Sequence, residues 1–176
     1  KIALLHRYPK DQIKETNAAF PYLVEKGIDV LTFKRFDRIS KWRKFFKSLC
    51  FILYAPLLVF GKGYDTIYCD DSYPFYPAFV KLASPKSRVV IRLGDLHLMY
   101  YYSGIAYKIL HFFEKIAWRM ADEIIVISDV MNDFLVKETK QGYSKINTVF
   151  DPVDPKDFPI TGAKSRGTVM FHGLLI

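Results

Sequence analysis

The 176 residues of this chain include 51% hydrophobic and 25% charged residues, a composition that excludes an intrinsically disordered protein and suits one globular domain. The formal net charge is +8, and residues 1–60 hold 12 Lys or Arg against 5 Asp or Glu, so nearly all of the excess lies in the first third. A basic segment of this kind attracts the phosphates of lipids, nucleotides or nucleic acids.

The cysteines and the apolar runs indicate the cellular compartment of the protein. Two cysteines in a chain of this length make no disulfide framework, which favours the reducing cytoplasm. The longest apolar run, 49–60, has 12 residues. A membrane-spanning helix needs roughly 20. We therefore expect a cytoplasmic protein without a spanning segment.

Strand patterns and helix patterns alternate along the chain. In order, we predict strand 2–5, helix 16–26, strand 29–33, helix 41–60, strand 66–69, helix 77–82, strand 88–93, helix 105–121, strand 123–127, a helix capped by Ser128 and reaching 140, and strand 146–149. This alternation predicts an α/β fold with a doubly wound, Rossmann-like parallel sheet. For the helix 41–60 we expect a core-facing stripe of Trp42, Phe45, Phe46, Leu49, Ile52 and Leu53.

The end of the chain differs from the rest. Residues 151–167 carry three prolines and few apolar residues, which is typical of a linker. Residues 168–176 then start with a strand pattern and a glycine turn. We therefore expect one domain at 1–150, an interdomain linker at 151–167, and the start of a second, truncated domain at 168–176.

Polar residues follow four of the predicted strands. Because ligands bind outside the carboxyl ends of the strands in an open parallel sheet, we expect these residues to line one edge. The candidate site residues are His6, Arg7, Asp70, Asp71, Gly94, Asp95, His97 and Ser128.

Asp95 and His97 are the sharpest pair in this set. A carboxylate and a nearby imidazole can bind a sugar hydroxyl or handle a proton. Gly94 beside them allows an unusual backbone angle or the close approach of a ligand. The alternative is that Asp95 caps a turn and that His97 packs on the aromatic residues at 100–102.

The other candidates have two interpretations each. Asp70 and Asp71 can bind a metal or sugar hydroxyls, or they can cap the next helix. Ser128 is an N-cap, and a helix N-terminus is also a place where anions bind. His111 fits an ordinary packing or surface residue.

The basic segment leads into the helix 41–60. A basic start followed by aromatic side chains is typical of helices that lie in a membrane interface. The predicted membrane contacts are Lys41, Trp42, Arg43, Lys44, Phe45, Phe46 and Lys47. The alternative is a core helix with a solvated basic rim. Nucleic acid is not an expected partner, because the aromatic residues cluster with apolar ones and form no stacking platform.

Several signatures are missing from the sequence. It has no GxGxxG fingerprint, no phosphate-binding P-loop, no GxSxG elbow and no Cys/His metal spacing. We therefore expect no metal and no bound cofactor.

Six segments, taken in order, resemble the N-terminal domain of GT-B glycosyltransferases of the retaining family 4 type. Residues 63–68 resemble a "yDvIh" strand start, 89–95 a "vvltvHD" strand, and 121–128 an "aD.iiavS" strand. Residues 130–135 resemble the helix that follows this strand in the family. Residues 145–154, together with Phe158, are similar to "ki.vipNGvD...F", and residues 168–173 are similar to "vlfvG".

The resemblance implies a sugar transferase that acts with retention. A missing C-terminal domain would hold a nucleotide-sugar co-substrate, with Gly173 on the donor side, and catalysis would occur between the two domains. Asp95 and His97 would be catalytic, and His6, Arg7, Asp70, Asp71, Gly94 and Ser128 would bind the acceptor. That acceptor would be a lipid-linked or cell-surface glycan precursor, reached from the inner face of an anionic membrane, and the fragment alone would be inactive.

A second function stays open at this point. Where the family has a histidine before the aspartate, this chain has Gly94. That difference favours a non-catalytic, basic α/β module that binds anionic lipid or another polyanion.

Overall fold

The computed structural model describes residues 1–6, 25–32, 41–70, 75–94, 96, 103–140 and 142–149, with the backbone alone at 41–49 and 143. The elements in chain order are β1 (Ile2–His6), β2 (Asp29–Thr32), α3 (Lys41–Val59), β3 (Thr66–Asp70), α4 (Tyr76–Ala83), β4 (Arg88–Leu93), α6 (Gly104–Met120), β5 (Glu123–Val126), α7 (Asp129–Thr139), η1 (Tyr143–Lys145) and β6 (Ile146–Thr148).

These elements confirm the predicted strands and the helices after residue 40 to within one or two residues at each end. The short 3₁₀-helix η1 was not predicted. The predicted helix 16–26 lies outside the described residues apart from its last two. The linker 151–167 and the start of a second domain at 168–176 lie wholly outside them.

The six strands form one sheet in the order β2-β1-β3-β4-β5-β6, and every neighbouring pair is parallel. This arrangement confirms the predicted α/β class and is consistent with a Rossmann-like doubly wound fold. The chain moves from β1 to β2 in one direction and then continues with β3 on the other side of β1. The carboxyl ends of β1 and β3 therefore flank the topological switch point, where open α/β sheets bind ligands.

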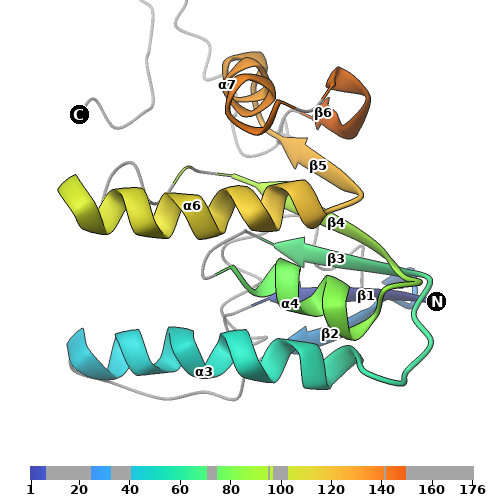
Figure 1. The fold of residues 1–176 in the computed structure, drawn as a ribbon. Coiled ribbons are helices and arrows are strands. Elements are labelled where there is room, and N and C mark those ends of the chain that lie inside the picture. The colour runs from blue at the N-terminus through green and yellow to red at the C-terminus, as the bar shows by residue number, and fades with distance from the viewer. Residues whose placement is uncertain are drawn as a thin grey trace, which may run out of the picture.

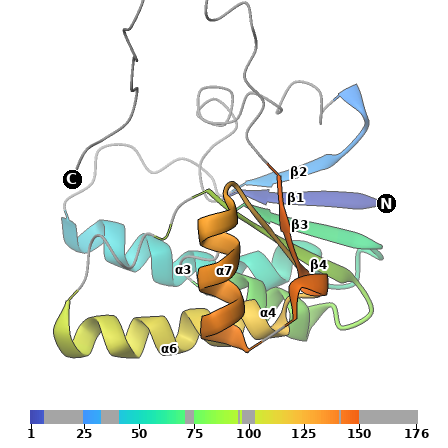
Figure 2. The ribbon, with the colours of Figure 1, turned by 90° about the horizontal axis from the view of Figure 1, so that it is seen from above.

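The helices α3, α4 and α6 lie side by side along the sheet (Figure 1). In the view turned by 90°, the same three helices lie on one side of the strands (Figure 2). Of the described helices, the remaining one, α7, contacts α6 and packs on β5 and β6. The main core fills the space between this helical layer and the sheet.

Alternation along the strands decides which side chains enter that core. Leu5, Ile67 and Ile91 are fully buried and belong to one cluster with Phe51 of α3 and Trp118 of α6. Such close packing makes truncation costly, on the order of 3 kcal/mol for a large aliphatic side chain.

The buried stripe of α3 differs from the predicted one. Phe51, Ala55 and Val59 are buried, at the i, i+4, i+8 spacing of one helix face. Leu53, which we expected in the core, is 65% exposed. Residues 51–60 are apolar on every side of the helix, so their pattern does not select one face. The other expected core residues up to 49 have no described side chains.

The predicted N-cap of α7 is confirmed, and a second polar contact connects more distant elements. Ser128 is extended, with φ −153°, and its hydroxyl accepts a hydrogen bond from the Met131 N–H at 3.3 Å, so it caps α7. Asp122, at the end of α6, accepts hydrogen bonds from the Val89 N–H at 2.7 Å and from Lys81 Nζ at 2.6 Å. This carboxylate joins the start of β4 to the end of α4, and so fixes β5 beside β4.

Candidate functional site

Three charged or polar side chains meet at the carboxyl edge of the sheet, at the ends of β1, β3 and β4. His6 Nε2 lies 2.7 Å from Asp70 Oδ2, and Arg92 Nη1 donates to Asp70 Oδ1 at 3.3 Å. The strand register explains the meeting. Asp70 pairs directly with Arg92, and the pairing of Leu5 with Cys69 brings His6 beside Asp70. We call these three residues the sheet-edge cluster.

The sheet-edge cluster points away from the main core. Side chains alternate between the two faces of a strand. Asp70 and Arg92 therefore share the sheet face of Tyr68 and Val90, while Cys69 and Ile91 face α3, α4 and α6. The cluster thus lies at the switch point, on the face opposite the described helical layer.

The three side chains of the sheet-edge cluster differ in how deeply they are buried. The side chain of Arg92 is 24% exposed, that of Asp70 is 13% exposed and that of His6 is 5% exposed. Burial raises the pKa of the Asp70 carboxyl, but the hydrogen bond and charge of His6 and the charge of Arg92 outweigh it. The net pKa lies below its usual value, so Asp70 is a carboxylate at neutral pH.

Tyr76 of α4 supports the cluster from the core side. Its hydroxyl lies 3.4 Å from the Leu5 carbonyl oxygen and 3.3 Å from the Asp70 carbonyl oxygen, so it connects the carboxyl ends of β1 and β3. Tyr76 is fully buried, and so is Cys69 beside it. Burial raises the pKa of the Cys69 thiol, which stays protonated.

The chemistry available to the sheet-edge cluster is that of polar recognition. An ionised carboxylate accepts hydrogen bonds from hydroxyl groups, and a guanidinium recognises phosphate or carboxylate through a planar set of donors. An imidazole can donate or accept a proton. Together they suit a ligand that carries both hydroxyl groups and negative charge.

The structure brings together two of the predicted site residues, His6 and Asp70, and corrects two interpretations. Asp70 does not cap α4, because the N-cap residue of this helix is Phe75, in a left-handed conformation with φ 63°. Of the two possibilities at Gly94, the structure does not show the unusual backbone angle, because the φ of Gly94 is not in the left-handed region. A Cβ built on Gly94 would meet Arg92 Nη1 at 3.8 Å, an ordinary contact.

The other predicted residues divide into two groups. Ser128 lies at the carboxyl end of β5, and its hydroxyl is the N-cap of α7. The backbone at the predicted membrane contacts is helical, but their side chains are not described. Arg7, Asp71, Asp95, His97 and Gly173 lie outside the described residues.

Sequence reasoning missed Arg92. Its signal was a charged residue inside a strand that otherwise reads as buried, RVVIRL. Such a residue needs a partner, because an unpaired charge is expensive to bury. Only the register of β3 against β4 identifies Asp70 as that partner.

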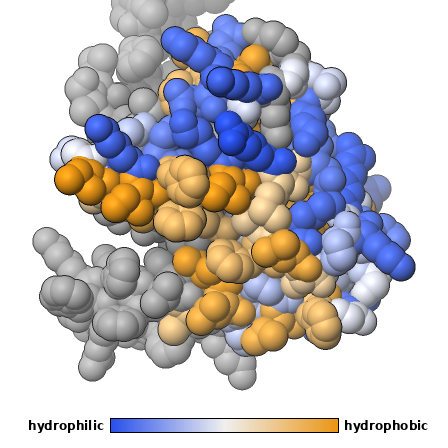
Figure 3. Space-filling model, in the orientation of Figure 1, coloured by the Kyte–Doolittle hydropathy of each residue, from blue (hydrophilic) through white to orange (hydrophobic). Residues whose placement is uncertain are grey.

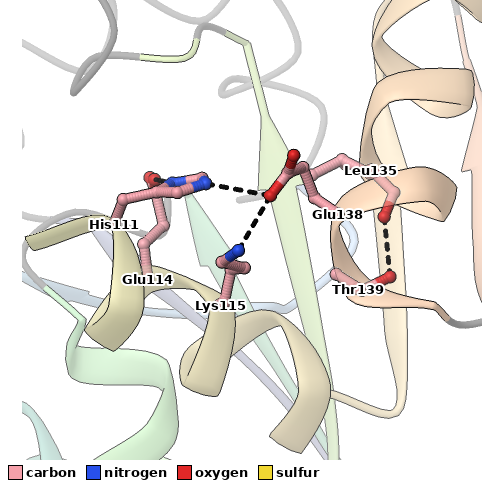
Figure 4. A network of polar contacts seen from close by, with 6 residues as sticks. All are labelled: His111, Glu114, Lys115, Leu135, Glu138 and Thr139. Carbon is pink, nitrogen blue, oxygen red and sulfur yellow. Dashed lines mark hydrogen bonds and ion pairs between the residues drawn. The ribbon is translucent and has the colours of Figure 1, made fainter. Parts of the chain in front are cut away.

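A second cluster joins α6 to α7. His111 Nδ1 lies 3.4 Å from Glu114 Oε2, its Nε2 lies 3.2 Å from Glu138 Oε2, and Lys115 Nζ donates to the same Glu138 oxygen at 2.9 Å. Figure 4 shows the three α6 side chains gathered opposite Glu138 of α7. We call these four residues the helix-junction cluster.

The helix-junction cluster extends the interpretation of His111. The residue is buried, as a packing residue would be, and its ring stacks on Tyr107 with centroids 5.1 Å apart. It also has a carboxylate at each ring nitrogen, which the sequence did not predict. The hydrogen bonds from Lys115 and His111 hold the pKa of Glu138 below its usual value.

Two searches of the described ranges concern metals and membranes. Among these residues, no group of three or more His, Cys, Asp or Glu side chains is arranged to hold a metal ion. No helix in the same ranges combines the length and the apolar character needed to cross a membrane.

Comparison with known proteins adds no identity to this geometry. No known protein family matches the sequence, and no curated protein matches it significantly. The fold and the site define a Rossmann-like α/β protein with a histidine–aspartate–arginine cluster at its topological switch point.

Proposed function

We propose that this chain is the acceptor-side domain of a GT-B glycosyltransferase that transfers a sugar from a nucleotide-sugar with retention. The observation that carries the proposal is the sheet-edge cluster at the switch point between β1 and β3. The ordered sequence segments that resemble retaining family 4 enzymes support the same function.

Each member of the cluster has a role in this proposal. Asp70, held as a carboxylate, accepts hydrogen bonds from the hydroxyl groups of the acceptor. Arg92, the most exposed member, binds a phosphate or carboxylate of the acceptor. His6 fixes the orientation of Asp70 through its 2.7 Å contact.

The reaction would take place where this edge faces a second domain that holds the donor. The acceptor oxygen bonds to the anomeric carbon on the face that the nucleoside diphosphate leaves, and the leaving phosphate takes the hydroxyl proton. Asp95 and His97, which follow β4 in the sequence, would orient the acceptor hydroxyl. The protein contributes position and charge stabilisation to this step.

The test is nucleoside diphosphate release by the full-length protein, using UDP- and GDP-sugars with a panel of free and lipid-linked saccharides. We expect release that depends on the acceptor, and a loss of about 100-fold in Asp95→Asn or His97→Ala, because misplaced reactants cost that order of rate. Asp70→Asn and Arg92→Met should raise the acceptor KM. Asp133→Asn, at an exposed position of α7, is the matched control. The absence of release with every donor would contradict the proposal.

A further inference from the structure

Large apolar side chains gather on the outer surface of the helical layer. Of the 13 exposed large hydrophobic residues in the described ranges, 10 lie on or next to α3, α4 and α6. We call them the outer apolar face: Leu53, Tyr54, Leu57, Phe60, Phe79, Leu82, Ile105, Ile109, Phe112 and Phe113. Figure 3 shows a broad hydrophobic area over the described side of this helical layer.

The arrangement of this face is that of an amphipathic layer with its apolar side outward. Ile105, Ile109 and Phe112 follow the helical period along α6 and are 76%, 53% and 60% exposed. Leu53 and Leu57 lie one turn apart on α3 and are 65% and 68% exposed. Because α4 contacts both helices, the three stripes form one surface. A contiguous patch of this kind marks an interaction site.

The described side chains of α3, α4 and α6 include four basic residues and one acidic residue, Glu114. Lys81 and Lys115 form ion pairs with Asp122 and Glu138, whereas Lys108 and Arg119 are exposed on α6. Glu114 is 3% exposed and lies against His111, so it does not offset these two exposed cations. By contrast, α7 carries three acidic residues and one lysine.

We propose that the outer apolar face docks on an anionic lipid bilayer. Apolar residues on helices that lie flat in the interface insert among the acyl chains, and the lysines and arginines beside them meet the anionic headgroups. A second copy of the chain fits this face less well, because self-association would bring two basic surfaces together. This surface is distinct from the predicted contacts at Lys41–Lys47, although it continues along the same helix, α3.

The site and the docking surface then lie on different parts of the molecule. The sheet-edge cluster is on the sheet face opposite α3, α4 and α6. When the protein is bound through its helical layer, the sheet-edge cluster therefore faces away from the membrane. The docking proposal is independent of the sugar-transfer proposal, and its test needs neither donor nor acceptor.

The experiment is co-sedimentation of the full chain with vesicles of phosphatidylcholine alone or mixed with phosphatidylglycerol. We expect binding to the mixed vesicles, weakened by salt. Leu57→Gln combined with Phe112→Gln should lower the partition coefficient by about tenfold or more, because two exposed apolar side chains no longer insert. Val130→Gln, at an 81% exposed position on α7, should bind like the wild type.

A charge pair tests the second half of the proposal. Lys108, on α6 beside the apolar stripe, is reversed in Lys108→Glu, and the control Lys137→Glu reverses another exposed lysine, on α7. We expect about tenfold weaker binding for the first and little change for the second, because each cation contributes only near the anionic surface. Circular dichroism and thermal melting of each variant show that it is folded.

Three outcomes would overturn the proposal. One is a wild-type chain that binds neither vesicle type, and another is a Leu57/Phe112 variant that binds as well as the wild type. The third is a concentration-dependent dimer, seen by light scattering, that the same variant dissociates. That result would assign the outer apolar face to a second copy of the chain.

Discussion

The sheet-edge cluster and the helix-junction cluster are built from the same kinds of groups, but they differ in what surrounds them. Each places a histidine against a carboxylate that also meets a basic side chain. The first joins three parallel strands at the switch point of the sheet, and the second joins two neighbouring helices. Their carboxylates, Asp70 and Glu138, have side chains that are 13% and 27% exposed.

This difference shows that residue types alone do not identify a functional site. Parallel strands open their carboxyl ends toward a crevice at the switch point, so a polar cluster there can meet a ligand. Polar contacts between two helices that are packed side by side stabilise the packing of those helices. We therefore assign recognition to the sheet-edge cluster and stability to the helix-junction cluster, and the two assignments predict different responses to mutation.

The largest effect is expected at Asp70. The variant Asp70→Ala removes the carboxylate that lies between His6 and Arg92, so the Arg92 guanidinium, which is 24% exposed, loses this ion pair. We expect a loss of about 3 kcal/mol in the free energy of unfolding, measured by urea denaturation, because breaking a buried ion pair costs that much. The double variant Asp70→Ala/Arg92→Met should recover part of the loss. A loss below about 1 kcal/mol would show that solvent already screens the pair.

A smaller effect is expected at Glu138. The variant Glu138→Ala removes the contacts to His111 and Lys115, but all three groups reach solvent to some degree, so we expect a loss of about 1 kcal/mol. Saccharide binding, followed by saturation-transfer NMR, should stay unchanged in Glu138→Ala and disappear in Asp70→Asn. If both variants lose binding, or neither does, the distinction between the two clusters is wrong.

Tyr76 tests the support beneath the sheet-edge cluster. The variant Tyr76→Phe keeps the buried ring, which packs edge-on against Phe51 at 4.8 Å, and removes only the hydroxyl. Because its two contacts are long, we expect a loss of about 0.5 to 1 kcal/mol in the free energy of unfolding.

The smallest effect is a change in pH dependence. An unfolded aspartate has a pKa of about 3.9, and that of Asp70 is lower in the folded protein. Between the two values the unfolded chain binds more protons, so the stability that Asp70 contributes is present above this range and is lost as the pH falls through the folded pKa. Asp70→Asn should flatten the pH dependence below about pH 4, measured by thermal unfolding at fixed salt. An unchanged slope would contradict the ion pair.

Much of the fold could be predicted from the sequence, because its signals are local. The β-branched run 124–127 reads as a buried strand wherever it lies, and Ser128 caps α7 through a hydrogen bond to Met131, only three residues away. The alternation of such strands with helices determined the parallel sheet. His6 and Asp70 could be named as candidates, because each directly follows a predicted strand.

The tertiary structure alone decided which of these residues meet. The pairing of Asp70 with Arg92 depends on the register of β3 against β4, and that of His111 with Glu138 on how α7 packs beside α6. The sequence likewise did not determine which face of α3 is exposed, because residues 51–60 are apolar on every side of the helix. Packing on the sheet buries Phe51, Ala55 and Val59. Contacts between distant segments depend on register and packing, and neither is encoded in the neighbours of a single residue.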